Sequence, residues 1–118
     1  MRFMIIVKSN PEFEAETTPQ NPDEKLMAAM ADYHEQLSKA GVLLDASGLQ
    51  PSRKGWRIHY DGPKRRVVDG PFTETKELIA GFTTIQVRSR EEALEWSRRF
   101  PNPVGEGAPA VIEVRQLY

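Results

Sequence analysis

Two successive strand–helix–strand patterns constrain this 118-residue chain more than any other feature of its sequence. Apolar runs indicate four strands, at residues 2–8, 42–46, 78–87 and 110–117. One helix separates the first strand from the second, and another separates the third from the fourth. This order predicts a single α+β domain over residues 1–118, of the ferredoxin-like βαββαβ type. Both helices are expected on one face of a four-stranded antiparallel sheet.

Local signals mark the ends of the first helix. Asn21 can cap its start, Pro22 suits the first helical position, and Gly41 can adopt the left-handed conformation that ends a helix. Its apolar face is expected at helical spacing, formed by Leu26, Met30, Tyr33 and Leu37. The polar segment before the helix, residues 10–20, is predicted to be a mobile surface loop.

The second strand–helix–strand pattern carries signals of its own. Ser89 and Glu92 form the sequence pattern of a capping box at the start of its helix, and Pro101 stops that helix. The strand at 78–87 is the longest and is predicted to lie centrally in the sheet. Gly81 in its middle would allow close approach of a neighbouring backbone or of a ligand.

A predicted hairpin is inserted between the two patterns. Residues 56–61 alternate between apolar and polar, residues 61–64 form a turn, and residues 66–69 return. Six of the sixteen basic residues gather in this region: Arg53, Lys54, Arg57, Lys64, Arg65 and Arg66. With Trp56 and Tyr60 they could contact nucleic acid or an acidic partner. A solvated hairpin is the favoured interpretation, and the net charge of -1 argues against a dedicated nucleic-acid-binding protein.

The sheet is expected to have two apolar faces. Phe3, Ile5 and Val7 point to one side of the first strand, and Met4 and Ile6 point to the other. Two helices can cover only one of these faces. A second copy of the chain is the simplest cover for the other, which predicts a homodimer with its sheets face to face.

The composition excludes several classes of function. The chain has no cysteine, which excludes disulfides, thiol catalysis and Cys-ligated metal sites. Its two histidines fall on different elements and no nucleotide or phosphate-loop motif occurs, so we expect neither a metal nor a cofactor. No apolar run is long enough to span a bilayer, so we expect no membrane association and, by default, a cytoplasmic protein.

One long motif carries a resemblance to a known family. Residues 69–82 read Asp-Gly-Pro-Phe-Thr-Glu-Thr-Lys-Glu-Leu-Ile-Ala-Gly-Phe, which resembles the signature of the DGPF branch of the YCII-related proteins. Further similar pieces lie at 40–44, 48–52, 92–96 and 112–115. The resemblance implies a dimeric ferredoxin-like α+β barrel, in a mostly bacterial family whose activity is largely unassigned. It also implies a link to extracytoplasmic-function sigma factors, beside which some members are encoded.

This sequence departs from the family at two positions. Other branches of the superfamily are proposed to use a His–Asp pair for proton transfer. Matched by spacing from Gly41 and Trp96, those places hold Met30 and Phe100 in this chain. Neither side chain can transfer a proton, so that chemistry does not carry over.

The charged part of the motif is a candidate ligand site. Asp69, Glu74, Lys76 and Glu77 could rim a pocket, the carboxylates as acid or base and the lysine as an anion clamp. Phe72 would anchor this segment by burying its ring. The alternative is a turn that these charges merely stabilise.

Tyr33 and His34 on the first helix are expected to border the same pocket. His34 is, with Asp69, a weak candidate for catalysis, because histidine carries protons near neutral pH. A lone histidine at the edge of an apolar face is nevertheless more often structural. His59 falls on the polar side of the hairpin, where solvent is its expected neighbour.

Glu113 and Arg115 form another candidate pair. They lie two residues apart on the last strand, so both project from one face. A structural ion pair is the favoured interpretation, because charges facing a barrel must be paired. The alternative is that Arg115 binds a carboxylate or phosphate group of a ligand.

These features leave the function open between classes. The first is a dimeric protein that binds a small anionic metabolite and could act on it as an enzyme. The second is a regulatory interaction module that contacts a sigma factor through its basic hairpin or acidic motif. A scaffold without a ligand is the third.

Overall fold

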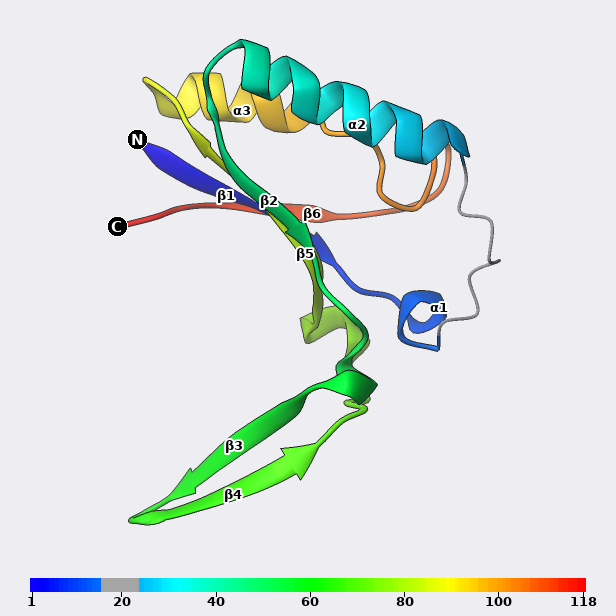
Figure 1. Ribbon diagram of the computed structural model, residues 1–118, viewed down its shortest axis with the longest axis vertical. Coiled ribbons are helices and arrows are strands. Elements are labelled where there is room, and N and C mark those ends of the chain that lie inside the picture. Colours follow the sequence, from blue (N-terminus) through cyan, green and yellow to red (C-terminus); the bar gives the residue numbers. More distant parts are fainter. Residues whose placement is uncertain (16–23) are drawn as a thin grey trace.

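The computed structural model describes residues 1–15 and 24–118, which form a helical layer, a four-stranded sheet and a separate hairpin (Figure 1). The sheet contains β1 (Arg2–Lys8), β2 (Leu43–Gly48), β5 (Ile79–Gln86) and β6 (Ile112–Gln116). The two long helices are α2 (Glu24–Lys39) and α3 (Arg90–Arg98). The strand order is β2-β5-β1-β6, and all neighbours are antiparallel. This is the predicted ferredoxin-like arrangement.

β5 is an inner strand of the sheet, as predicted. It has eight residues and is the longest of the described strands. A Cβ atom at Gly81 would lie 3.0 Å from the Ser47 carbonyl oxygen and 3.3 Å from the Gly48 Cα atom. Gly81 therefore permits the close approach of β2 to β5, which is one of the two roles predicted for it.

The two long helices cover one face of the sheet (Figure 1). The register pairs Phe3 with Ile85 and Ile5 with Val114, so these side chains point together toward the helices. They belong to one core, whose buried members are Phe3, Ile5, Tyr33, Leu37, Val42, Ile85, Val87 and Ala93. Burial of these side chains is the main force that holds the helical layer on the sheet.

The ends of the long helices follow from local sequence. Gly41 ends α2 with φ +72°, as predicted. The Ser89 hydroxyl caps α3 by accepting from the Glu92 N–H at 3.1 Å. The Glu92 carboxylate accepts from the Arg88 N–H at 3.0 Å, one residue before the position that a capping box uses. The predicted cap of the first helix, residues 21–22, lies outside the described residues.

The prediction of a loop at residues 10–20 is wrong for its first part. A short helix, α1 (Pro11–Glu14), begins directly after Asn10. The Asn10 side chain accepts from the Phe13 N–H at 2.8 Å, and proline at the first helical position needs no hydrogen-bond partner for its nitrogen. The remainder of the predicted loop, residues 16–20, lies outside the described residues.

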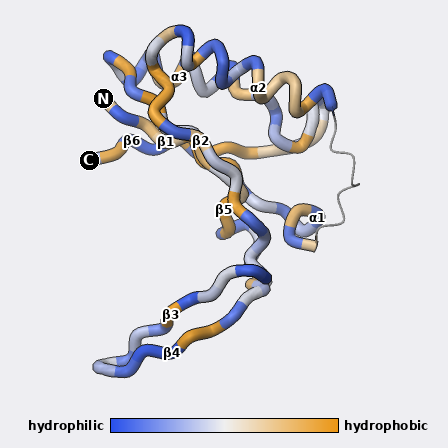
Figure 2. The backbone as a smooth tube through the Cα atoms, viewed as in Figure 1, coloured by the Kyte–Doolittle hydropathy of each residue, from blue (hydrophilic) through white to orange (hydrophobic). Residues whose placement is uncertain are grey.

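The predicted hairpin consists of β3 (Trp56–Asp61) and β4 (Lys64–Asp69). Within the described part of the chain these strands pair only with each other, and they project from the body on the side away from the helices (Figure 1). Asp61 pairs directly with Lys64, so the turn is at the predicted residues 61–64 and β4 begins two residues earlier than predicted. Apolar and polar residues alternate along β3, whereas β4 has three basic residues followed by two valines (Figure 2).

A cluster that we call the hairpin brace holds the base of this hairpin. The Ser52 hydroxyl accepts from the Phe72 N–H at 3.1 Å and donates to the carboxylate of Glu14 on α1. The Ser52 N–H donates to the same carboxylate at 3.1 Å. The Gly70 N–H donates to the Gly55 carbonyl at 3.0 Å. The brace thus joins the first residues of the sequence motif, α1 and the turn before β3 into one unit.

Gly70 should be essential to the brace. A Cβ atom there would overlap the Ser52 carbonyl oxygen and lie 2.6 Å from its carbon, whereas one at Gly55 would lie an ordinary 3.6 Å from that oxygen. We expect Gly70→Ala to lower the free energy of unfolding by about 1–3 kcal/mol. The control Gly55→Ala should cost less than about 1 kcal/mol. Equal losses for the two variants in urea unfolding would contradict this role.

Candidate functional site

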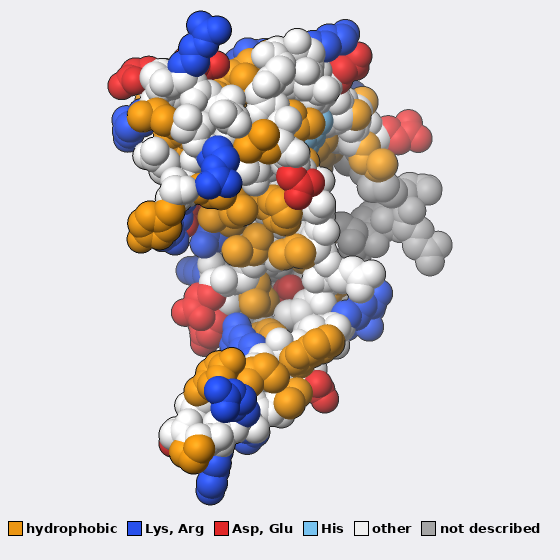
Figure 3. Space-filling model, turned by 60° about the vertical axis from the view of Figure 1, so that its left-hand side comes forward, with side chains coloured by type: hydrophobic (Ala, Val, Ile, Leu, Met, Phe, Trp, Pro, Cys, Tyr) orange, Lys and Arg blue, Asp and Glu red, His pale blue; other side chains and the backbone are white. Residues whose placement is uncertain are grey.

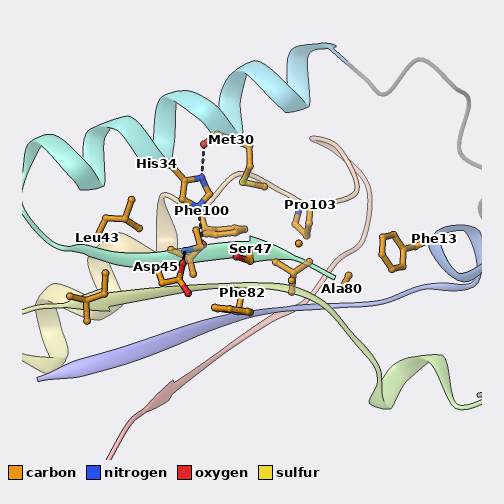
Figure 4. A pocket seen from close by; sticks show the side chains of 16 residues that line it. Phe13, Met30, His34, Leu43, Asp45, Ser47, Ala80, Phe82, Phe100 and Pro103 are labelled. Atoms are coloured by element: carbon orange, nitrogen blue, oxygen red, sulfur yellow. Dashed lines mark hydrogen bonds between the residues drawn. The ribbon is translucent and has the colours of Figure 1, made fainter. Parts of the chain in front are cut away.

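A hollow of about 760 Å³ lies between α2, the sheet and the segment that follows α3 (Figure 4). We call it the α2 cavity. Its wall is largely apolar and includes Val7, Phe13, Met30, Leu43, Phe82 and Phe100. Among the described residues, the polar side chains that line it belong to His34, Asp45, Ser47 and Thr83. An apolar hollow with few polar groups is the usual form of a small-molecule site.

His34 links α2 to the sheet at this cavity. Its Nδ1 atom lies 2.8 Å from the Met30 carbonyl oxygen, and its Nε2 atom lies 2.8 Å from the Oγ1 atom of Thr83 on β5 (Figure 4). A carbonyl oxygen can only accept, so Nδ1 must carry a proton. In the neutral ring, Nε2 then accepts from the Thr83 hydroxyl. Thr83 is only 2% exposed and His34 is half-buried, so this hydrogen bond is partly shielded from solvent.

The edge strand β2 forms one border of the α2 cavity. Ala46 pairs with Thr83 and shares its face of the sheet, whereas Ser47 pairs with Phe82 on the opposite face. The register between β2 and β5 shifts between Leu43 and Asp45. Residues from both faces of β2 therefore border the cavity, and the exposed carboxylate of Asp45 stands at its rim.

Tyr33 lies in the core rather than in the α2 cavity. It is 3% exposed, and its hydroxyl donates to the Trp96 carbonyl at 2.8 Å. Burial raises the pKa of Tyr33 to about 12, against a smaller lowering effect of the Arg99 cation. Its ring packs edge-on against Phe100, with centroids 5.2 Å apart. Tyr33 therefore supports a residue of the cavity wall without reaching the cavity itself.

The two positions at which this sequence differs from the proposed His–Asp pair of other branches both border the α2 cavity. Met30 and Phe100 line it, as Figure 4 shows. His34 follows Met30 by four residues on α2, so both side chains lie on the same side of the helix. The cavity thus has apolar groups where other branches are proposed to hold their acid–base pair, and a histidine one turn further along.

The beginning of the sequence motif lies away from this cavity. Asp69 is the last residue of β4, is exposed and pairs with Trp56. Phe72 is half-buried, and the Arg57 guanidinium stacks over its ring at 3.8 Å. Neither Asp69 nor Phe72 lines the α2 cavity, so the structure does not bring them together with His34.

The charged end of the motif is also separate from the α2 cavity. Glu74, Lys76 and Glu77 are exposed, in or next to the short 3-10 helix η2 (Thr75–Glu77). Lys76 borders a different hollow of about 470 Å³, which Lys8 also lines. The ligand site that the sequence placed across the motif and the first helix is therefore divided between separate places.

The pair on β6 is held in a small charge network. The Arg115 guanidinium lies 3.8 Å from the Glu113 carboxylate, and the Lys8 ammonium lies 3.5 Å from it. This is the ion pairing that the sequence favours. The side chain of Arg115 is 74% exposed, so the pair contributes little to stability. His59, on the hairpin, is exposed as expected.

Several cavity residues escaped the sequence analysis. Thr83 carries the one available signal, since it alternates with Ile85 on the strand and so falls on the buried face. Asp45 and Ser47 had no distinguishing context, because their role depends on the edge position of β2. Phe13 belongs to α1, which the sequence analysis assigned to a loop.

No cluster of three or more His, Cys, Asp or Glu side chains that could hold a metal ion occurs among residues 1–15 and 24–118. The helices in this described part are all too short or too polar to cross a membrane.

Comparison with known proteins assigns the chain to a family. The profile of the YCII-related domain matches residues 1–117. The chain belongs to the YCII-related family. One relative is an uncharacterized protein from Rhizobium meliloti (strain 1021). It is 30% identical to this YCII-related protein over 93 residues, which cover 79% of this chain and 75% of the relative.

A solved structure resembles this YCII-related protein over its full length. It is a 5-chloro-2-hydroxyhydroquinone dehydrochlorinase from Burkholderia phenoliruptrix, in complex with 2,5-dihydroxybenzoquinone. The two chains are 15% identical with a TM-score of 0.47, and the match covers 100% of this chain and 94% of the other.

Tyr33 should give this YCII-related protein a specific dependence of stability on alkaline pH. Tyr33→Phe removes the hydrogen bond to Trp96 and should cost about 1 kcal/mol at pH 8. Tyrosine ionises near pH 10 in the unfolded chain, but Tyr33 keeps its proton to about pH 12 in the folded one. Its contribution is therefore complete below pH 10 and is lost as the pH rises toward 12.

Urea unfolding at pH 8 and at pH 11 tests this expectation. The stability difference between wild type and Tyr33→Phe should shrink at the higher pH. The control Tyr118→Phe changes a fully exposed side chain and should match wild type at pH 8. A difference between wild type and Tyr33→Phe that stays constant with pH would contradict the assignment.

Proposed function

We propose that this protein binds a small, largely apolar organic molecule in the α2 cavity. The observation that carries the proposal is the apolar hollow with the hydrogen-bonded pair of half-buried His34 and buried Thr83 in its wall. Its volume of about 760 Å³ is within the usual range for small-molecule sites, ~300–1,000 Å³. The apolar wall supplies binding energy, and the few polar groups would set the orientation of the ligand.

The hydrogen-bonding state of Thr83 defines the ligand class further. A hydroxyl has one proton and two lone pairs, and the Thr83 proton is given to neutral His34. With the His34 ring neutral, a ligand that reaches the Thr83 oxygen can therefore only donate to it. Asp45 at the rim is an acceptor as well. We infer a neutral ligand that donates a hydrogen bond, such as a phenol or an alcohol.

The anionic metabolite favoured by the sequence has weaker support. No Lys or Arg is among the described residues that line the α2 cavity. Lys8 and Lys76 border the smaller hollow, but Lys8 already pairs with Glu113 at 3.5 Å. If the protein were an enzyme, His34 would be the first candidate for proton transfer. Its hydrogen bond to Thr83 must break before Nε2 can take a proton. Binding is therefore the primary proposal.

We further propose that the protein acts as a homodimer whose two sheets form an α+β barrel. The sheet face opposite the helices has an apolar centre, where Met4 pairs with Thr84 and Ile6 with Phe82. Within the described part of the chain no helix covers this face (Figure 1). A second copy would cover it. The sigma-factor association remains a prediction from the family resemblance.

Thermal-shift measurements with paired compounds test the ligand proposal. p-Cresol and p-toluate share a methylated ring but differ in a neutral hydroxyl against a carboxylate. We expect phenols of such a paired panel to raise the melting temperature of the wild type, and their benzoates to do so less, because bound ligand stabilises the folded state. The result should hold at equal concentration of each compound.

Matched variants locate the binding. Ala46→Leu adds bulk on the face that Ala46 shares with Thr83 and should abolish the shift by filling the cavity. Ala31→Leu makes the same change at an exposed position of α2 and should preserve the shift. Stabilisation by benzoates alone would contradict the neutral ligand class. No stabilisation by any compound, or a shift that survives Ala46→Leu, would contradict the cavity as the site.

A further inference from the structure

The β3–β4 hairpin exposes a continuous apolar surface. The register places most of its apolar side chains on one face, with Ile58 opposite Val67 and Tyr60 opposite Arg65, whereas Val68 lies on the other face. The exposed fractions on this face are 65% for Trp56, 38% for Ile58, 69% for Tyr60 and 62% for Val67. Arg65 stacks over the Tyr60 ring at 4.9 Å. A two-stranded hairpin with an uncovered apolar face is marginally stable in water, so this face is expected to have a partner.

The orientation of this hairpin is fixed rather than left to a flexible linker. The hairpin brace holds both ends of the hairpin, through Gly70 with Gly55 and through Phe72 with Ser52. Arg57 of β3 also stacks on the Phe72 ring at 3.8 Å. The motif at residues 69–82 thus fixes the orientation of the hairpin. Among the described residues, the hairpin makes no strand pairing with the body.

We propose that the apolar face of the hairpin packs on a second copy of this chain, each hairpin reaching across to the other protomer. The proposal rests on the homodimer proposed above and adds the contact that the hairpin makes in it. The hairpin lies on the side of the sheet away from the helices, toward the open sheet face (Figure 1). Figure 3 shows apolar side chains of the body and of the hairpin on the same face of the molecule.

The exposed area fits a reciprocal contact between two copies. The four apolar side chains of the hairpin expose roughly 400 Å² together, on the scale of ~150–250 Å² for one aromatic side chain. A stable interface buries about 800 Å² on each partner. In a two-fold dimer each protomer buries its own hairpin face and an equal area that receives the other hairpin. Two reciprocal hairpins therefore reach the required area, and one does not.

The chemistry of the hairpin face favours a protein partner over a nucleic acid. Ile58 and Val67 occupy its centre, and aliphatic side chains offer neither stacking nor charge to a nucleic acid. The opposite face carries His59 and Arg66, so several of the basic groups point away from the apolar surface. The net charge of -1 gives two copies almost no mutual repulsion.

Analytical ultracentrifugation of paired variants tests the proposal. The double variant Trp56→Ser/Tyr60→Ser removes the two aromatic groups from the apolar face and should raise the dimer dissociation constant at least tenfold. The control His59→Ser/Arg66→Ser changes the other face of the same strands. It should leave the dimer dissociation constant within threefold of the wild-type value. Circular dichroism must show the same folded body in all three proteins, because both pairs are exposed.

Cross-linking identifies the contact directly. The chain has no cysteine, so Val67→Cys can carry a benzophenone label at a single site. In dimers mixed from light and heavy isotope-labelled chains, the cross-links should join residue 67 of one copy to the other copy. Cross-links confined to one chain would overturn the proposal.

The outcomes separate this proposal from the ones on which it rests. A wild-type dimer that both double variants leave unchanged would overturn the hairpin contact and keep the dimer. A wild type that is monomeric at micromolar concentration would overturn both, while the ligand proposal stands on its own thermal-shift test. Binding of a single-stranded RNA oligonucleotide that Trp56→Ser/Tyr60→Ser abolishes, without loss of the dimer, would assign the face to nucleic acid instead.

Discussion

The pairing of β5 with both β1 and β2 is the interaction on which the rest of the structure depends. β5 joins the two strand–helix–strand units into one sheet, and its side chains serve different purposes in turn. Ile85 is fully buried in the core under the helices, and Thr83 binds His34 at the α2 cavity. Gly81 admits β2 closely enough to form the border of that cavity. A change on this strand therefore affects fold and site together.

The segment before β5 has a mechanical role in the described structure. Its Gly70 N–H donates to the Gly55 carbonyl and its Phe72 N–H donates to the Ser52 hydroxyl, and the carboxylate of Glu14 holds Ser52 in turn. Ser9 also donates to this carboxylate, at 3.3 Å, which connects the brace to the end of β1. A distinctive motif is often interpreted as a site of chemistry. Here its distinctive residues are explained by the close backbone approach at Gly70 and by the hydrogen bonds of Gly70 to Gly55 and of Phe72 to Ser52.

The fold could be predicted further than the site, for a physical reason. Strands and helix ends are specified by neighbouring residues, so Gly41 and Ser89 marked the ends of their helices correctly. α1 was missed because a four-residue helix has almost no periodicity, although Asn10 followed by proline was a usable signal. The α2 cavity combines residues from α1, α2, β1, β2 and β5 and the segment after α3. No local pattern shows that such distant residues meet. The sequence analysis predicted a site from charged residues, whereas the wall of the cavity is largely apolar.

The His34–Thr83 pair shows how one hydrogen bond can set the character of a cavity. The Nδ1–H of His34 donates to the Met30 carbonyl, so only Nε2 can act as either a hydrogen-bond donor or an acceptor. With a neutral ring, Thr83 donates to Nε2 and offers a ligand only its lone pairs. With a charged ring, Nε2 donates, and the Thr83 proton becomes free to bind an acceptor. The neutral ring therefore matches the hydrogen-bond-donating ligand proposed above, whereas a charged ring would match an acceptor.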